Sequence, residues 1–570
     1  MLVNRAIRWQ LLVAAWWAVG ACRSGGAMSV NKFGSSDGQV ESSQVPHDGS
    51  SDQRPAVDLA TGTPLDPWSP GDAGPADLRV DVNTQFENSA ISPWIYGVNF
   101  DVRDRHKQRW GIVRMGGNRS TAYNWENNAS NAGSDYLFQN DSSASESDAP
   151  AKPLLDFIDA ASEIDAAAIV TISNVDYVSA DKNGGGDVRN SGPQYLRTRF
   201  KRNHASKGAP FTALPDPNDG DVYQDEFVAF LKARRPKAKL LLSMDNEPDL
   251  WSHTHAEVFS APVTYADLWR RNHDFARAAK AVWPGIAVLG FVSYGYSGFL
   301  NLQNAADADG RPFLDWYLTQ ARAAERTEGM RLIDYLDLHW YPEAQADGER
   351  VTGSSVSPAV VRARVQAPRA LWDPSYRETS WIQKVANGPI DLLHWAQAKI
   401  DRFYPGTKLA FSEWNFGGGN HISGAIAVAD VLGIFGKHGV GVATYWPLAA
   451  DESFGYSAFR AYRNYDGNGS SFADISVSAK SSRPDIVTAY ASKQSDRPER
   501  TVILLINKDT ASRRVALRIG HLAAYSTANV FLLTGAQPEL RAGTSLRAVA
   551  TNAFSYEMPA LSVSVIVPQP

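Results

Sequence analysis

Two segments of the chain each end an apolar run with a glutamate. Glu247 follows Asn246 at the end of one run, and Glu413 precedes Trp414 at the end of another. One carboxyl group at the end of each of two buried strands is the minimal equipment for cleaving a glycosidic bond with retention, because one group acts as acid and then base while the other attacks the sugar carbon. A single glutamate at a strand end is more often solvated or salt-bridged. Two of them, each beside Asn or Trp, favour a shared catalytic pocket.

This chemistry requires opposite protonation of the two carboxyl groups. Glu413, as the nucleophile, has to be ionised, and a nearby cation such as Arg114 favours that form. Glu247, as the acid/base, has to carry a proton, and burial beside another negative charge raises the pKa of such a group. A separation of about 5–5.5 Å between the carboxyl groups would indicate retention, and a wider gap inversion.

The elements that would position these residues follow from the alternation of patterns along the chain. From residue 95 onward, short β-branched runs alternate with helical patterns, which is typical of parallel βα units. Eight such strands predict a (β/α)8 barrel, whose active site lies at the C-terminal strand ends. An open doubly wound sheet is the alternative, but no Gly-rich phosphate loop follows the first strand. The candidate strands are 95–100, 112–117, 168–173, 240–246, 286–293, 335–340, 409–414 and 442–447.

Further polar and aromatic residues close these predicted strands. Arg114 lies on the second strand, His339 lies near the end of the sixth, and Tyr341 directly follows the sixth. Asn246 precedes the predicted acid and could bond the sugar 2-hydroxyl, and Tyr341 or Tyr445 could orient the nucleophile. Each residue also has a structural explanation: Arg114 could pair with a structural acid, and His339 could be a satisfied core histidine. The whole group therefore carries more weight than any one member.

The ends of the chain differ from this central part. Residues 469–570 contain alternating apolar runs without helical segments, which predicts an antiparallel β-sandwich. The stretch 78–94 begins with a strand pattern that could join this sandwich before the catalytic barrel, 95–468. Residues 22–77 are rich in Ser, Gly, Asp and Pro, so we expect a flexible linker there.

The N-terminus predicts export. Two arginines precede a short apolar stretch, which is typical of a signal peptide at 1–21. Cys22, the single cysteine of the chain, follows Val-Gly-Ala in a pattern that resembles a bacterial lipobox. We expect lipidation of Cys22, which would anchor the protein to a bacterial membrane or cell surface. An ordinary cleaved signal with an incidental cysteine would leave the protein extracellular.

Composition excludes some classes of function. The net charge of −5 is mild and no long Lys/Arg block appears, which argues against nucleic-acid binding. The 17 tryptophans exceed what is usual, and exported sugar-binding proteins use this side chain as a stacking platform. With 570 residues the chain has room for more than one domain. We expect a monomer.

Several motifs, in this order along the barrel, resemble glycoside hydrolase family 44. They are far more specific than one Asn-Glu pair, and the resemblance covers about residues 78–570, weakest in the C-terminal domain. The motifs are Met-Gly-Gly-Asn-Arg at 115–119, the Trp-Glu-Asn-Asn segment at 123–133, Asp-Asn-Glu-Pro-Asp-Leu-Trp at 245–251 with its continuation to 255, Phe-Leu-Asp-Trp-Tyr-Leu at 313–318, Leu-His-Trp-Tyr-Pro at 338–342, Ser-Glu-Trp-Asn at 412–415, and the helix start at 421–427.

The resemblance implies a barrel plus a β-sandwich and a retaining, endo-acting cleavage of β-1,4-glucans, with cellulose derivatives and xyloglucan as family substrates. Glu247 matches the family acid/base and Glu413 its nucleophile. The chemistry requires no cofactor. Residues in or beside matching motifs are our candidates for substrate contacts: Arg114, Trp125, Asn246, His339, Tyr341 and Trp446.

Members of the family can carry a structural calcium, and the acidic Gly-rich stretch ending at Asp187 could contribute to such a site or be a tight solvated loop. His253 and His255 lack an evident third zinc ligand. Two other functions stay open: another barrel endo-glycosidase, such as a mannanase or xylanase, and a catalytically silent surface protein that binds polysaccharide.

Overall fold

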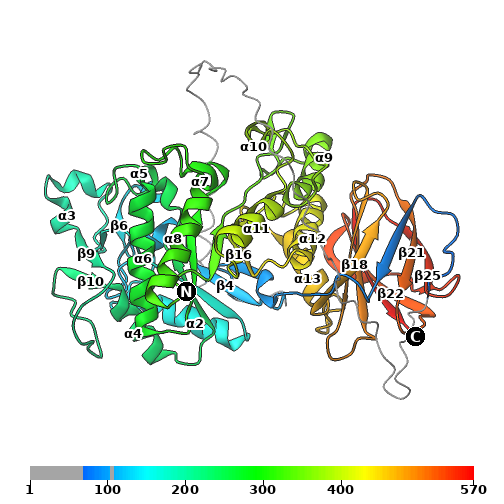
Figure 1. Ribbon diagram of the computed structural model, residues 1–570, viewed down its shortest axis with the longest axis horizontal. Coiled ribbons are helices and arrows are strands. Elements are labelled where there is room, and N and C mark those ends of the chain that lie inside the picture. Colours follow the sequence, from blue (N-terminus) through cyan, green and yellow to red (C-terminus); the bar gives the residue numbers. More distant parts are fainter. Residues whose placement is uncertain (1–68, 103–107) are drawn as a thin grey trace, which may run out of the picture.

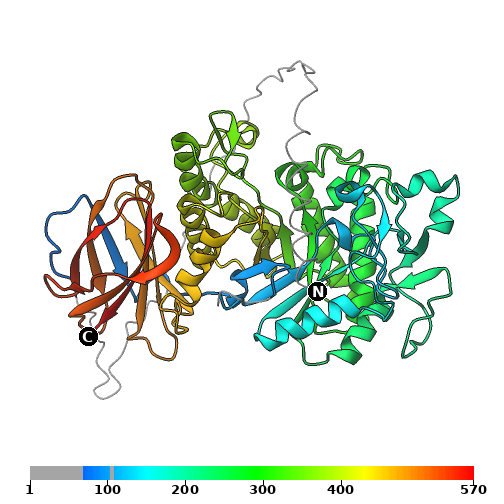
Figure 2. The same ribbon diagram turned by 180° about the vertical axis from the view of Figure 1, so that it is seen from behind.

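The computed structural model describes residues 69–102 and 108–570. They form an elongated molecule in which a helix-covered barrel adjoins a β-sandwich at one end (Figure 1). The view from behind shows the same two parts joined side by side (Figure 2). The predicted signal 1–21, the lipidation candidate Cys22 and the linker up to residue 68 lie outside the described residues. Among the described helices, none combines the length and apolar character needed to cross a bilayer.

Eight parallel strands close into a barrel, which confirms the predicted (β/α)8 fold. The closure is completed by β17, which pairs with β3. The barrel strands in chain order are β3 (Gly97–Asn99), β4 (Ile112–Met115), β7 (Ala167–Ile172), β11 (Leu240–Met244), β12 (Ala287–Ser293), β13 (Tyr335–Leu338), β16 (Lys408–Trp414) and β17 (Val442–Tyr445).

The barrel interior is layered because side chains alternate in direction along each strand. A lower layer is apolar and includes Ile112, Leu241 and Ala410. Two residues further along β4 and β16, the same inward direction is taken by Arg114 and Ser412, both fully buried. The layer directly beneath the C-terminal strand ends is therefore polar, and its side chains can form hydrogen bonds to the residues at the strand ends.

Helices cover the outside of the barrel and also form the segments after the strand ends (Figure 1). Thr264 caps one of them, α6, by accepting a hydrogen bond from the backbone N–H of Asp267 at 3.1 Å. The α-helices are α2 (Lys152–Glu163), α3 (Tyr195–Thr198), α4 (Gln224–Arg234), α5 (Trp251–Thr254), α6 (Tyr265–Val282), α7 (Tyr296–Asn301), α8 (Phe313–Glu328), α9 (Pro358–Gln366), α10 (Trp381–Ala386), α11 (Leu392–Phe403), α12 (Ile422–Lys437) and α13 (Ser453–Arg463).

Short strands lie in the long connections after β4, β7 and β13. They form two two-stranded ribbons and one three-stranded sheet of their own. The strands are β5 (Ser130–Asn131), β6 (Asn140–Asp141), β8 (Tyr177–Ser179), β9 (Phe200–His204), β10 (Asp221–Tyr223), β14 (Gln345–Ala346) and β15 (Glu349–Arg350).

The C-terminal strands form the predicted sandwich. Its main strand order is β23-β22-β26-β20-β19-β18-β1-β21-β25. Nearly every pairing is antiparallel, and β1 pairs with β21 in parallel. The strands are β1 (Leu78–Asn83), β2 (Ser89–Ala90), β18 (Ile475–Ser481), β19 (Val487–Lys493), β20 (Thr501–Asn507), β21 (Arg513–Gly520), β22 (Thr527–Thr534), β23 (Gln537–Ala542), β24 (Leu546–Arg547), β25 (Ala553–Met558) and β26 (Ser562–Gln569).

The N-terminal strand β1 is inserted between β18 and β21, so the sandwich is built from both ends of the chain. Residues 69–77, which we expected within the flexible linker, also lie against it. Ala73 is 3% exposed. The backbone N–H of Gly71 donates to the carbonyl of Thr551 at 2.7 Å. The segment that contacts the sandwich therefore begins before residue 78.

The barrel and sandwich share a core through α12 and β20. Strand β20 is buried on both faces: Ile503 packs inside the sandwich, while Leu504 packs in the core shared with the barrel. Helix α12 carries Asp430, which forms a fully buried ion pair with Lys508 of the sandwich at 2.6 Å. The two parts are therefore joined by a continuous interior rather than by a surface contact.

Candidate active site

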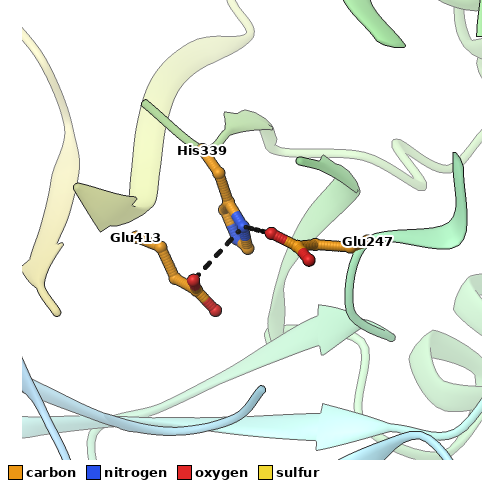
Figure 3. Close-up of side chains that lie close together, drawn as sticks. All are labelled: Glu247, His339 and Glu413. Atoms are coloured by element: carbon orange, nitrogen blue, oxygen red, sulfur yellow. Dashed lines mark hydrogen bonds and ion pairs between the residues drawn. The ribbon is translucent and has the colours of Figure 1, made fainter. Parts of the chain in front are cut away.

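The two glutamates identified from the sequence lie together at the C-terminal end of the barrel. Glu247 follows β11, and Glu413 lies near the end of β16, with His339 from the strand end between them (Figure 3). One oxygen of each carboxyl group and one ring nitrogen of His339 all lie within 4.8 Å of one another. The side chains of Glu247 and Glu413 are 12% and 7% exposed, so the pair is nearly enclosed yet open to a ligand.

Glu413 is held by a cation and a hydroxyl. The Arg114 guanidinium donates to Oε1 at 2.8 Å, and the Tyr341 hydroxyl donates to Oε2 at 2.8 Å. Burial and the negative charge of Glu413 raise the pKa of Tyr341 well above its usual range, so this hydroxyl keeps its proton and remains a donor. Both contacts stabilise Glu413 as a carboxylate, the form a nucleophile needs.

The same arginine also holds Asn246, the residue that precedes Glu247. A second guanidinium nitrogen of Arg114 donates to the Asn246 side-chain oxygen at 2.8 Å. The Asn246 amide then donates to Asn118 at 3.0 Å, and Asn118 donates to Asp135 at 3.0 Å. This chain of hydrogen bonds fixes the amide beside Glu247 in one orientation.

Glu247 has the opposite electrostatic environment. Burial raises its pKa to about 7, the negative charge of Asp135 adds to this, and Arg114 opposes it. Its Oε1 lies 2.9 Å from Nδ1 of His339. Glu247 therefore carries a proton in mildly acidic solution, while Glu413 is paired with a cation. Two carboxyl groups whose environments differ in this way are the arrangement expected for an acid/base and a nucleophile.

The backbone around Glu247 is strained. Asp245 and Glu247 have φ angles of 68° and 42°, and Val292, whose carbonyl accepts the Glu247 N–H at 3.0 Å, has a φ of 65°. Side chains with a Cβ, and β-branched Val above all, rarely adopt this left-handed region. The Asp245 carboxylate offsets the strain by accepting the Thr121 hydroxyl at 2.6 Å and the Asn246 N–H at 2.8 Å. Such strain is typical of functional sites.

Two of the aromatic candidates differ in position. Trp446 is half-buried at the end of β17, where it contacts Phe100 edge-on at 4.9 Å, so part of its ring is open to a sugar. Trp125 is 1% exposed and stacks on Phe227 at 5.4 Å in the hydrophobic core. The expectation that Trp125 contacts substrate is therefore wrong: its neighbours on α4 cover the ring.

The choice between two tyrosines as the partner of Glu413 is settled in favour of Tyr341. The Tyr445 hydroxyl instead donates to Glu452 at 2.7 Å. Asn118, one of the polar residues that close the second predicted strand, and Asp135, which sequence reasoning left out of the site, complete the hydrogen-bond chain. Asn118 directly follows a predicted strand, which is a usable signal, whereas Asp135 lies in a short 3-10 helix, Gly133–Tyr136, for which the sequence offers no such signal.

The predicted calcium ligand does not fit a cation. The Arg189 side chain donates to both Asp187 oxygens, at 2.9 and 2.6 Å, and these bonds lower the pKa of Asp187. A calcium ion would have to displace this guanidinium. Within the described ranges, a single trio of side chains lies close enough to share a metal ion: Glu247, His339 and Glu413. The Arg114 guanidinium beside Glu413 opposes a cation there.

Comparison with known proteins agrees with this site. The sequence model of glycoside hydrolase family 44 matches residues 129–344. Endoglucanase A of Paenibacillus lautus is 38% identical over 518 residues, which cover 87% of this chain and 73% of that protein. This chain belongs to glycoside hydrolase family 44. The comparison confirms the resemblance to family 44 that the motifs indicated, and it confirms that the protein is a glycoside hydrolase.

Solved structures of family 44 extend the comparison to the whole fold. A Paenibacillus polymyxa xyloglucanase, solved with xyloglucan, has a TM-score of 0.82 at 36% identity and covers 86% of this chain and 99% of its own. A Clostridium thermocellum endoglucanase has a TM-score of 0.81 at 37% identity with the same coverage. The barrel and the sandwich are thus both shared with family 44 enzymes.

Proposed function

We propose that this family 44 hydrolase is a retaining, endo-acting β-1,4-glucanase that cleaves cellulose-type glucans and xyloglucan. The observation that carries the proposal is the spacing of Glu247 and Glu413, of which one carboxyl oxygen each lies within 4.8 Å of the other. Retaining enzymes hold the two carboxyl groups about 5–5.5 Å apart, whereas inverting enzymes leave room for a water molecule. The related proteins include an endoglucanase and a xyloglucanase, which supports the choice of polymer.

The geometry supports a double displacement. Glu413, oriented by Arg114 and Tyr341, attacks the anomeric carbon while Glu247 gives its proton to the leaving oxygen. The bond from the anomeric carbon to that oxygen breaks, and a glycosyl ester forms on Glu413. Esterification removes the negative charge of Glu413, so Glu247 then accepts a proton from water, which attacks the same carbon and releases Glu413.

The first experiment measures viscosity loss and reducing-end release on xyloglucan and carboxymethyl cellulose, with mannan and xylan in parallel. Fast viscosity loss by the intact protein, abolished in Glu413→Gln, would support an endo-acting β-glucanase. A preference for mannan or xylan would replace the substrate assignment. Binding without release would favour a surface polysaccharide-binding protein. The anomer released first, followed by NMR, distinguishes retention from inversion.

We further propose that the protein is exported and lipidated on Cys22, and that it acts as a monomer on polymer outside the cell. The lipobox-like sequence supports this. In a bacterial host, the full chain would partition into detergent, and Cys22→Ser would move it to the aqueous phase. An unchanged partition in the variant would contradict lipidation.

A further inference from the structure

His339 contacts the acid/base and a buried hydroxyl at the same time. Its Nδ1 lies 2.9 Å from Glu247 Oε1 and 3.6 Å from Glu413 Oε2, and its Nε2 lies 3.1 Å from the Ser412 Oγ. The ring is fully buried. Burial lowers the pKa of His339; Glu413 and Asp337 oppose this and the Arg114 charge adds to it, so the net shift favours the neutral ring. A neutral imidazole has one N–H and one lone pair, so it can donate to only one of its two partners.

The Ser412 hydroxyl decides which nitrogen carries the proton. In the described part of the chain, Nε2 of His339 is the sole hydrogen-bonding atom that this buried hydroxyl contacts. If Nε2 carried the proton and donated to Oγ, the hydroxyl hydrogen would have no acceptor, which is unfavourable in a buried site. If the hydroxyl donates to Nε2, the proton lies on Nδ1 and every group is satisfied.

The charges on the other side of the ring favour the same form. Nδ1 faces oxygens of both Glu247 and Glu413. An N–H directed between two carboxyl groups is attracted to both, whereas a lone pair in that position would be repelled by the Glu413 carboxylate. Two separate features, the hydroxyl at Nε2 and the carboxylates at Nδ1, thus place the hydrogen on Nδ1.

We propose that His339 is a positioning residue, held by Ser412 in the Nδ1–H form, which anchors Oε1 of Glu247 and leaves Oε2 as the oxygen that loses and regains the proton. The Nδ1–H group can donate to Oε1 whether Glu247 is a carboxylic acid or a carboxylate. The ring therefore needs no change of tautomer when Glu247 switches from acid to base. The kinetic consequence of this inference rests on the proposed double displacement. The assignment of the proton to Nδ1 does not depend on it.

The tautomer is tested directly by NMR of the full protein labelled with ¹⁵N-histidine. The chain has 11 histidines, and the His339 signals are assigned by their loss in His339→Asn. The couplings of each ring nitrogen to the carbon-bound ring hydrogens identify the protonated nitrogen. We expect the proton on Nδ1 in the wild type. A proton on Nε2 would overturn the proposal.

The kinetic test compares Ser412→Ala with Thr444→Val. Thr444 is a fully buried neighbour whose hydroxyl donates to the Ser412 carbonyl at 2.5 Å, so its loss removes a similar hydrogen bond without touching the ring. Ser412→Ala should lower kcat/KM on cello-oligosaccharides by about tenfold to a hundredfold, because Glu247 is misplaced. On dinitrophenyl cellobioside, whose leaving group needs no proton, it should change kcat/KM little.

The matched control separates this role from simple destabilisation. Thr444→Val should change kcat/KM equally on both substrates, and so should any merely structural defect. An equal loss on both substrates in Ser412→Ala would overturn the positioning role. His339→Asn, whose amide can donate from near the Nδ1 position, should retain more activity on oligosaccharides than His339→Gln. A wild type that is inactive on all glucans, with the proton on Nδ1, would refute the proposed function and leave the tautomer assignment standing.

Discussion

Tyr341 and Tyr445 have the same side chain and both lie at the C-terminal end of the barrel, but their hydroxyl groups contact different carboxyl groups. Tyr341 donates to Glu413, and Tyr445 donates to Glu452, which also accepts the backbone N–H groups of Leu448 and Ala449. Glu452 thereby holds the loop after β17, and Tyr341 holds Glu413, the proposed nucleophile. At the residue scale, function here depends on which carboxyl group a hydroxyl reaches.

Tyr341→Phe and Tyr445→Phe form a matched pair of variants. A hydrogen bond to a charged group contributes about 1.5–3 kcal/mol, so Tyr341→Phe should lower kcat/KM by roughly tenfold to a hundredfold. Tyr445→Phe should change kcat/KM little and lower the melting temperature instead. Initial rates on xyloglucan and thermal unfolding measure the two effects. Equal kinetic losses would contradict the assignment of Tyr341 to the nucleophile.

Asp135 sets part of the pH dependence. Glu247 has to be protonated to act as an acid, so kcat/KM falls as the pH rises through its pKa of about 7. The negative charge of Asp135 raises that pKa. Asp135→Asn removes the charge and keeps the shape, so it should lower the pKa of Glu247 and move the basic limb to lower pH. Profiles of kcat/KM against pH test this, and a shift toward higher pH would refute it.

At the scale of elements, α12 shows how closely the barrel and the sandwich approach. Gly433 lies where an added Cβ would be 2.3 Å from the Tyr490 ring of β19, whereas at Gly436 the nearest atom would be 3.5 Å away. The close packing of α12 on β19 therefore requires glycine at position 433, whereas position 436 has room for a larger side chain.

Gly433→Ala and Gly436→Ala should change stability in opposite directions. The first forces the helix and Tyr490 apart and should lower the free energy of unfolding by about 1–3 kcal/mol. The second adds a methyl group in ordinary contact and should raise it by about 0.5–1 kcal/mol, because alanine favours a helix over glycine. Thermal or denaturant unfolding measures both. A stabilising effect of Gly433→Ala would contradict the close packing described here.

The sequence predicts this fold well where the signal is local. All eight barrel strands follow from apolar runs, and the position of Glu413 within β16 follows from the polar residue that ends its run. What sequence reasoning missed depends on distant contacts. Trp125 has the composition of a sugar platform, but Phe227 covers it. Residues 69–77 have the composition of a linker, yet they find a surface on the sandwich. The sequence around Trp125 does not indicate that Phe227 will cover it, and the sequence of residues 69–77 does not indicate that they will contact the sandwich.

At the scale of the whole molecule, the buried pair Asp430 and Lys508 joins the two parts. Asp430 also accepts the hydroxyl groups of Thr488 and Tyr490, each at 2.7 Å. Three bonds thus run from one helix of the barrel to three positions of the sandwich. The shared interior predicts that barrel and sandwich unfold together.

Lys508→Met should destabilise the whole protein rather than the sandwich alone. Removing one partner leaves a buried charge unpaired, which costs about 3–5 kcal/mol. The double variant Asp430→Asn/Lys508→Met should recover much of this loss. Calorimetry and denaturant unfolding, followed by signals from both parts, should show one transition in each protein. Two separate transitions in the wild type would contradict the shared interior.

The insertion of β1 into the sandwich also has a consequence for the order of synthesis. Arg79 of β1 pairs with Ser482, 403 residues later in the chain. At a translation rate of about 5–20 residues per second, β1 waits roughly 20–80 s before its neighbours exist. During that time a strand with one apolar face emerges from the ribosome with both edges unpaired, while the barrel that follows it can already close. A chaperone that binds such a strand would protect its unpaired edges from aggregation. Export of the chain before it folds would also keep these edges from pairing wrongly inside the cell.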